Sequence, residues 1–386
     1  MERNVTLDVI RGVAVLGILL LNITAFGLPK AAYLNPAWYG VITPSDIWTW
    51  AFLDAFAQVK FLSLFALLFG AGLQMLLSRG TRWIQSRLFL LMLLGLAHGL
   101  LLWEGDILLS YGLVGLLCWR TIRDAPEEYS LFNTGVLLYL TGIAVLVILG
   151  ILPGGEPTNF WIPDLAHQQY ELFWRTQGGF EAIENRADLL TSAWVALAIQ
   201  YGWQLAGMMM IGAALMRNGW LKGEFSLPHY RRIGWGLVFL GLLINIPAII
   251  AQWQLDWAWR WCALLLQAPR ELSAPFQVIG YVALILGFWP QLSRFRAIKW
   301  VGCVGRMALT NYLLQTIICT ILFYHFGLFM KLDRLSLLIL VPVIWSINIL
   351  FSVLWLRYFR QGPVEWLWRQ LTRRVSGEHQ TINVRE

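Results

Sequence analysis

Ten apolar runs follow one another through this chain of 386 residues, and most of them are long enough to cross a lipid bilayer. A helix needs about 20 largely apolar residues to span the hydrocarbon core. The runs therefore predict an all-α polytopic membrane protein with about ten transmembrane helices. The second run is too long for one upright span, and Thr43-Pro44 at its start is typical of a helix N-terminus. The predicted spans cover about residues 7–28, 50–77, 86–103, 107–122, 130–152, 192–216, 233–252, 275–293, 298–323 and 335–357.

Composition agrees with a membrane protein and argues against other classes. Hydrophobic residues make up 58% of the chain and charged residues only 13%, whereas about 25% charged residues is usual in soluble domains. The net charge of +7 is spread over the gaps between the apolar runs, so no nucleic-acid partner is expected. No metal site is expected either, because the four cysteines lack metal-ligand spacing. They are Cys118, Cys262, Cys303 and Cys319.

The distribution of basic residues predicts the orientation of the chain. Of the 29 lysines and arginines, nineteen fall on the N-terminal side of the predicted membrane, seven on the other side and three inside the spans. Because cytoplasmic segments carry the excess of basic residues, both termini are predicted to be cytoplasmic. The acidic segment 153–191 is predicted to be an external amphipathic segment between the fifth and sixth spans. The charge-rich connection 217–232 is predicted to separate an N-terminal half (1–216) from a C-terminal half (217–386).

Three cations, Arg11, Lys60 and Arg306, lie inside the predicted spans. Such a group costs about 2.5–3.5 kcal/mol near the bilayer centre unless a partner or a polar cavity relieves it. Arg11 and Arg306 are predicted at a similar depth in the cytoplasmic half, where two guanidinium groups need an anion. A phosphate-bearing ligand or a lipid headgroup would supply that charge. The protein's own carboxylates, Asp8 and Glu365, are competing partners.

These groups also have ordinary explanations. Asp8 precedes Arg11 by three residues, so the two share a helix face and form an ion pair that orients the first helix at the inner interface. Asn22 follows Arg11 by eleven residues, about three helical turns, and extends the same polar face toward the outer side. For Lys60 the ordinary explanation is that its long side chain reaches outward to the membrane surface.

The third and fourth predicted spans carry the densest chemistry. Asp106 follows a tight connection and is predicted to lie close to the end of the helix that carries His98. A carboxylate in that place fixes the tautomer of an imidazole. Such a pair suits a base that activates an acceptor, a proton relay in a carrier, or a structural histidine. Tyr111, in the fourth span, belongs to the same polar region.

The ninth predicted span is too polar for exposure to lipid. In a continuous helix Arg306 and Thr310 share one face, and Asn311 shares another with Gln315. These residues are therefore predicted to face the interior of the bundle.

Several separated motifs resemble the YeiB family, whose C-terminal part is the domain of unknown function 418. The motifs are LDVIRGVAVLGILLLNI, FLSLFALLFGAG, GLAHG, GDILLSYGLVG, GRMALTNYLLQT and GPVEWLWRQLT, and together they cover essentially the whole chain. The resemblance implies a multi-pass protein of the bacterial inner membrane without an established activity, sometimes guessed to act in transport.

The N-terminal half is also similar, more distantly, to transmembrane acyltransferases of the heparan-alpha-glucosaminide N-acetyltransferase type, which share the LDxxRG pattern. In related O-acetylating enzymes a histidine follows the arginine by eleven positions, and this chain has Asn22 there. The similarity implies an acyltransferase-like fold with acyl-CoA as the donor and no covalently bound cofactor. His98 would then substitute for the family's histidine.

We therefore expect a protein that moves an acyl group from acyl-CoA to a lipid or glycan acceptor. His98 would serve as the base, oriented by Asp106, and Asn22 would stabilise the developing oxyanion. The alternatives are a transporter or flippase of a small or lipidic anion, and a lipid-binding structural or regulatory protein. Membrane lipids and a small-molecule or lipid anion are the expected partners, and a homo-oligomer is left open. The expected ligand-binding residues are Asp8, Arg11, Lys60, Tyr111, Arg306, Asn311 and Gln315.

Overall fold

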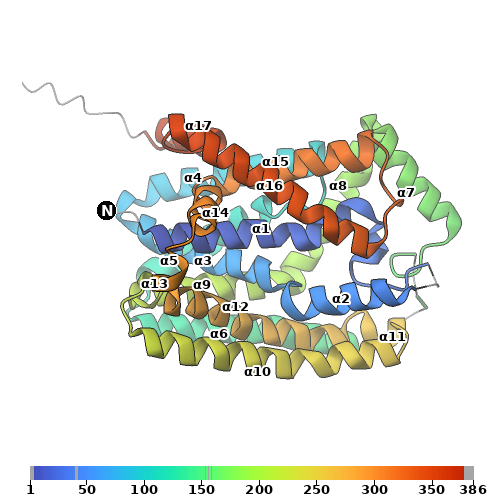
Figure 1. The fold of residues 1–386 in the computed structure, drawn as a ribbon, viewed down its shortest axis with the longest axis horizontal. Coiled ribbons are helices and arrows are strands. Elements are labelled where there is room, and N and C mark those ends of the chain that lie inside the picture. Colours follow the sequence, from blue (N-terminus) through green and yellow to red (C-terminus); the bar gives the residue numbers. More distant parts are fainter. Residues whose placement is uncertain (1–3, 40–41, 153, 155, 158, 378–386) are drawn as a thin grey trace, which may run out of the picture.

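The computed structural model describes residues 4–39, 42–152, 154, 156–157 and 159–377. Over this part of the chain every regular element is a helix, and the long helices run side by side along the longest axis (Figure 1). The first nine are α1 (Val5–Gly27), α2 (Pro44–Phe56), α3 (Lys60–Leu76), α4 (Thr81–Leu101), α5 (Leu108–Asp124), α6 (Glu128–Ile151), α7 (Leu165–Gln177), α8 (Gly179–Ala196) and α9 (Gly202–Arg217). The others are α10 (Leu227–Gln254), α11 (Trp259–Cys262), α12 (Ala268–Gly287), α13 (Trp289–Leu292), α14 (Arg296–Arg306), α15 (Ala308–Thr320), α16 (Arg334–Tyr358) and α17 (Pro363–Ser376).

The helices have the length and composition of a multi-pass membrane protein. Within the described residues six are long and apolar enough to cross a bilayer, or seven if α14 and α15 form one bent span. The six are α1, α2 with α3, α4, α6, α10 and α16. The all-helical prediction is thus confirmed, whereas the total of ten crossings, the division into halves and the side on which the termini lie stay predictions.

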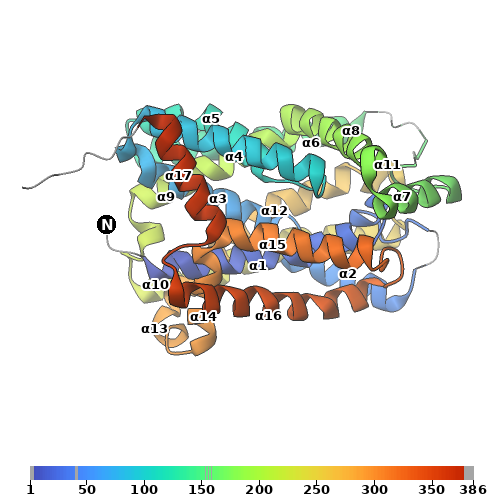
Figure 2. The ribbon, with the colours of Figure 1, turned by 90° about the horizontal axis from the view of Figure 1, so that it is seen from above.

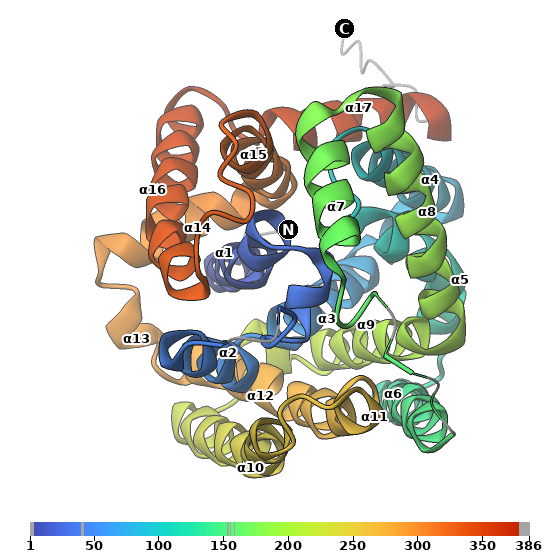
Figure 3. The same ribbon diagram turned by 90° about the vertical axis from the view of Figure 1, so that its right-hand side faces the viewer.

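Outer and inner helices differ in the way that a bilayer requires. α10 exposes Phe239, Leu243 and Ile250, and a soluble protein rarely leaves so much apolar area uncovered. In contrast, α1 is largely buried and contacts α3, α14, α15 and α16. The view along the helices places α1 inside the ring of the other elements (Figure 3).

The second apolar run is broken. Its first helix, α2, begins as predicted, with the Thr43 side chain accepting a hydrogen bond from the Asp46 N–H. It ends at Phe56, and α3 begins at Lys60 after Val59, whose φ of 68° lies in the left-handed region. A β-branched residue rarely adopts this conformation, so packing around the break must hold it.

The ninth predicted span also differs from a straight helix. α14 and α15 meet at Met307 with a bend of 89°. The prediction that Arg306 and Thr310 share a helix face is therefore wrong, because the face is not continuous across the bend. Arg306 instead occupies the last position of α14.

Three helices, α7, α8 and α17, cover the ends of the bundle. α7 and α8, from the predicted external segment, lie at the end opposite the start of α1 (Figures 1 and 3). Arg175 of α7 holds this end together, since its buried guanidinium pairs with Glu104 at 2.5 Å and Glu171 at 2.9 Å. At the other end, α17 crosses toward α4 (Figure 2) and contacts both α4 and α15.

Candidate functional site: an arginine-lined cavity

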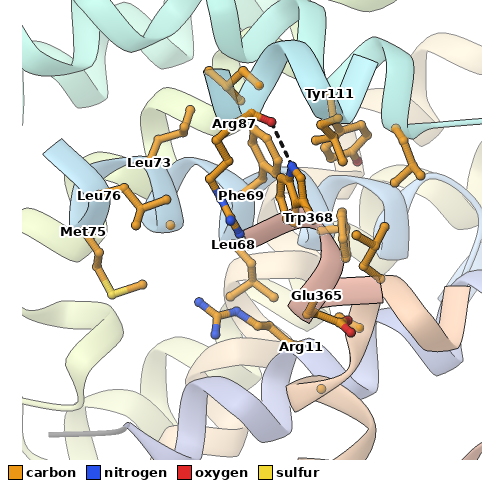
Figure 4. A pocket seen from close by; sticks show the side chains of 18 of the residues that line it. Arg11, Leu68, Phe69, Leu73, Met75, Leu76, Arg87, Tyr111, Glu365 and Trp368 are labelled. Carbon is orange, nitrogen blue, oxygen red and sulfur yellow. Dashed lines mark hydrogen bonds between the residues drawn. The ribbon is translucent and has the colours of Figure 1, made fainter. Parts of the chain in front are cut away.

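A cavity of about 330 Å³ lies between α1, α3, α4, α5 and the α14–α15 bend, with α17 over it. Arg11 of α1, Arg87 of α4 and Arg306 of α14 all line it. Figure 4 shows Arg11 and Arg87 extending toward the same space, beside Glu365 and Trp368 of α17. We call this space the arginine cavity.

The charge of the arginine cavity is unbalanced. Three guanidinium groups line it, and Glu365 is the one carboxylate among the described lining residues. That carboxylate is engaged with Thr310, accepting from its backbone N–H at 3.0 Å and its hydroxyl at 2.5 Å. Asp8 pairs with Arg11 from the adjoining cavity, but cations still outnumber carboxylates among the described residues, which favours an anionic ligand.

The three arginines are held in different ways. Arg11 Nη1 lies 3.5 Å from Asp8 Oδ1, a long contact for an ion pair. Arg306 donates to the carbonyl of Arg360 at 2.8 Å. The Arg87 guanidinium lies 3.4 Å from the centre of the Trp368 ring, an arrangement in which its N–H groups can still bind a ligand at the edge.

Apolar residues form the rest of the wall. They come mainly from α3, α4 and α5, and the Tyr111 ring joins them, with its hydroxyl donating to the Leu62 carbonyl at 2.7 Å. Gly72 leaves room at the wall, since a Cβ placed on it would meet no atom within 4 Å. A cavity with a cationic end and an apolar wall suits an amphiphilic anion. The apolar lining includes Phe65, Leu68, Phe69, Leu73, Leu76, Ile84, Leu88, Leu91 and Leu309.

A second cavity of about 950 Å³ adjoins the first, and both are lined by Arg11 and Met75. It adds Asp8, Arg217 and Lys222 near the start of α1. Arg217 is held by the protein itself, since it donates to Gln74 and to the backbone carbonyls of Ile122 and Ala125 at the end of α5. Arg11 thus stands between a narrow apolar chamber and a wider polar one.

Four of the predicted ligand-binding residues meet here, and three do not. Asp8, Arg11, Tyr111 and Arg306 line the two cavities. Lys60 lies instead at the α2–α3 break, fully buried, where its Nζ donates to the Asp54 carbonyl at 2.6 Å. The outward-reaching alternative for Lys60 is therefore wrong.

Asn311 and Gln315 connect helices. The Asn311 amide donates to Ser352 at 2.8 Å and accepts from Asn348 at 2.9 Å, joining α15 to α16. Gln315 donates to the Val15 carbonyl of α1 at 3.3 Å. Neither lines either of the two cavities.

The predicted pairing of His98 with Asp106 is confirmed, because His98 Nδ1 lies 2.9 Å from Asp106 Oδ1. Asp106 is itself fixed by the Leu109 N–H at 2.8 Å. On its other side, His98 Nε2 lies 3.0 Å from the Thr316 hydroxyl of α15. The imidazole is enclosed, with a side-chain exposure of 1%. Within the described residues no hydrogen bond joins Asn22 to this group.

Sequence reasoning missed Arg87 and the part played by α17. Arg87 is one of the nineteen basic residues that the charge distribution places outside the spans on the cytoplasmic side. In the structure it lies in the second turn of α4. The available signal was the amphipathic pattern of 363–376, in which Glu365 and Trp368 share a face three residues apart. Nothing in the sequence states which helix ends this face covers.

These features define the class: a helical, multi-pass membrane protein with an arginine-lined cavity at one end of the bundle. A family model described as "Protein of unknown function (DUF418)" matches residues 215–375. The chain is 71% identical to the "Uncharacterized protein YeiB" of Escherichia coli (strain K12), over 98% of each chain. It is 28% identical to the "Uncharacterized protein YxaH" of Bacillus subtilis (strain 168), over 96% of this chain and 94% of the relative. The chain therefore belongs to the YeiB family. No solved structure matches it.

Proposed function

We propose that the protein is an acyltransferase of the bacterial inner membrane that takes acyl-CoA from the cytoplasmic side into the arginine cavity. The observation that carries the proposal is the meeting of Arg11, Arg87 and Arg306, from three helices, on one partly apolar space. Donor phosphates would bind the guanidinium groups through charge-assisted hydrogen bonds. The apolar wall would hold the arm and the acyl chain.

The proposed base is His98, which lies on the same helix as Arg87. Eleven residues separate them, and at 1.5 Å per residue this is about 16 Å along α4, so a donor held by the arginines needs an extended arm to bring its thioester to the imidazole. His98 would remove a proton from the acceptor hydroxyl or amine, and the acceptor oxygen or nitrogen would form the new acyl bond. The thiolate would leave and take up a proton. The acceptor must displace the Thr316 hydroxyl to reach Nε2.

Asp106 and Asn22 have supporting roles in this proposal. The Asp106 carboxylate, 2.9 Å from Nδ1, would keep Nε2 free of its proton and able to act as a base. Asn22 would donate a hydrogen bond to the oxyanion that develops on the thioester carbonyl. Since no contact joins Asn22 to His98 in the described residues, its role depends on where the thioester binds.

One experiment distinguishes donor binding from acyl transfer. Purified protein is incubated with radiolabelled acetyl-CoA or palmitoyl-CoA and extracted envelope lipids, and both bound donor and labelled product are measured. Gly72→Leu should fill the arginine cavity and abolish binding and transfer together. His98→Gln should retain binding and lose transfer. Gly236→Leu is the matched control, because a Cβ there also meets no atom within 4 Å. Absence of donor binding to the unmodified protein contradicts the proposal.

The second candidate is a carrier or flippase of a lipidic anion, and the enclosure of His98 favours it. Neither of the two cavities is lined by His98, and a carrier needs no access to it. The break between α2 and α3 also favours a carrier, because discontinuous helices are typical of transporter sites. Counterflow of a labelled anionic lipid in proteoliposomes, without a covalent product, would establish this function in place of acyl transfer.

A further inference from the structure

The break between α2 and α3 gathers a second group of charges, away from the arginine cavity. It lies between the two ends of the bundle (Figure 1), where unpaired backbone groups are costly because no water can satisfy them. Side chains donate hydrogen bonds to the backbone carbonyls that the break leaves without a helical partner. Lys60 and Asn245 donate to the Asp54 carbonyl, Gln277 donates to that of Ala55, and the Tyr281 hydroxyl donates to that of Phe56.

Four buried charged groups accompany the break: Asp54, Lys60, Arg270 and Glu271. We call them the break cluster. Their formal charges cancel, with two cations and two carboxylates. Buried charges in a membrane are costly and often mark functional sites. The two carboxylates of the break cluster differ in their hydrogen-bond partners.

Asp54 is a well-satisfied carboxylate. Its Oδ2 accepts from Arg270 Nη1 at 3.1 Å, and its Oδ1 accepts from the Asn245 amide at 2.8 Å. Both partners are buried together with it. These contacts occupy both oxygens of the carboxylate.

Glu271 is held much less tightly. Its Oε2 accepts from the Gln204 amide at 3.3 Å, and its Oε1 lies 3.9 Å from Arg270 Nη2. The side chain is only 13% exposed, so water does not replace the missing contacts. When two carboxyl groups in one cluster have such different surroundings, the poorly satisfied one takes the proton.

The polar atoms around the cluster are not fully paired by the protein. Arg270 Nε, Asn245 Oδ1, Gln252 Nε2 and Gln267 Oε1 are buried without a hydrogen-bond partner in the described residues. Each belongs to a residue at most 4% exposed. A pocket of about 10 Å³ touches Asp54 and Arg270, close to the space that one water molecule needs. The cluster thus has room and unused donors and acceptors for a proton-carrying water.

A tyrosine hydroxyl fixes the backbone at Glu271. The Tyr139 hydroxyl of α6 donates to the backbone carbonyl of Glu271 at 2.8 Å. This bond positions the residue and leaves its carboxyl group to the two weak contacts described above.

We propose that Glu271 is a proton-binding site in the membrane interior. A hydronium ion transfers its proton to the carboxylate, which becomes the acid, and a water molecule is left. The break cluster then has one net positive charge, which adds to the attraction of an anion in the cavity. This inference does not depend on whether that anion is acylated or carried. The titratable and charged groups around Glu271 are Asp54 of α2, Lys60 of α3, Arg270 of α12, Tyr139 of α6, Tyr201 and Tyr33.

Infrared difference spectroscopy of the full-length protein in lipid nanodiscs tests the proposal. The acid form of Glu271 should give a protonated-carboxyl band that disappears as the pH is raised and shifts in deuterium oxide. Glu271→Gln should abolish that band, whereas Glu184→Gln, an exposed control, should leave it unchanged. A band that persists in a folded Glu271→Gln protein, or no titrating band in the unmodified protein, would overturn the proposal.

One more variant keeps the test decisive. If Glu271→Gln does not fold, Glu271→Asp retains a carboxyl group and should shift the frequency and the titration midpoint of the band. A band with unchanged frequency and midpoint in Glu271→Asp would show that it belongs to another carboxyl group and would overturn the proposal.

Discussion

The arginine cavity and the break cluster are both built from buried charges, but they differ in balance and in space. The arginine cavity has three guanidinium groups against one carboxylate, and a volume of about 330 Å³. The break cluster has two cations and two carboxylates, with Arg270 near both carboxylates, and a pocket of about 10 Å³ touches Asp54 and Arg270. Charge surplus with room suits a ligand, whereas balanced charge without room suits a structural support or a proton.

This difference also separates stability from binding. Removing one partner of a balanced buried pair leaves the other uncompensated, which is strongly destabilising. Removing one of several like charges at a cavity reduces their mutual repulsion, which offsets part of the contacts that are lost with it. The same type of substitution should therefore have opposite consequences in the two regions.

The largest expected effect concerns orientation, because the comparison assumes that the arginine cavity opens toward the cytoplasm. Ser78, which lines the wider cavity, and Gln177, at the end of α7, are both exposed and lie on opposite sides of the predicted membrane. A membrane-impermeant maleimide should label Gln177→Cys in intact spheroplasts and Ser78→Cys only after lysis. The unmodified protein is the control for labelling of the native cysteines, of which Cys118, Cys262 and Cys319 are buried and Cys303 is half-buried. The reverse pattern would place the cavity outside.

The next effect is on stability. Asp54→Ala should lower the free energy of unfolding by about 3–5 kcal/mol, because Arg270 would keep a buried charge without its partner. Arg306→Gln should change it little. Thermal unfolding of the two purified variants in the same detergent measures the difference. Equal losses of stability in both variants would remove the distinction between the regions.

Substitutions in the arginine cavity, which should affect stability little, should weaken the binding of palmitoyl-CoA. Arg87→Gln and Arg306→Gln should each weaken the binding of palmitoyl-CoA by about 10- to 150-fold, since a hydrogen bond to a charged group contributes about 1.5–3 kcal/mol. Equilibrium binding of a fluorescent palmitoyl-CoA analogue gives the dissociation constants. Lys331→Gln, at the far end of the bundle, serves as the matched control for the loss of one positive charge. If all three variants bind equally, the cavity does not hold the phosphates.

The smallest expected effect lies outside the membrane, at the start of α7. The pKa of Asp164 is lowered from 3.8, chiefly by the hydrogen bond from the His167 backbone N–H and then by the His167 side chain. The folded state therefore favours the ionised carboxyl, and its stabilising contribution is lost as the pH falls through this lowered pKa. Hydrogen exchange of α7 should rise below a pH of about 4. Asp164→Asn, which keeps a capping side chain, should show less dependence on pH over this range.

Much of the helical framework could be predicted from apolar run lengths. α1 and α16 begin and end within two residues of the predicted spans, because about 20 apolar residues have one stable conformation in a bilayer. The presence of Arg11 and Arg306 in one cavity, and the contact of His98 with Asp106, were also predicted. In these cases helix periodicity or a short connection limits where the side chains can lie.

Other features were beyond prediction because they depend on distant contacts. The left-handed Val59 ends one helix and starts another, and its position follows from carbonyls that Asn245, Gln277 and Tyr281 satisfy from α10 and α12. No proline lies at the bend at Met307, so the local sequence gives no signal for it. Such breaks are stable only when other helices supply the missing hydrogen bonds, and a single segment does not contain that information.

By itself the sequence determined the membrane class, the long apolar helices and the presence of charges that water cannot reach. Run length and composition are enough for this, because the bilayer imposes the same requirement on every segment. The tertiary structure alone decided which charges meet: Arg87 beside Arg11 under α17, and Asp54 with Arg270 at the break. Ion pairs and hydrogen bonds form only at contact distance, so only the arrangement of helices separates a binding surface from a balanced pair.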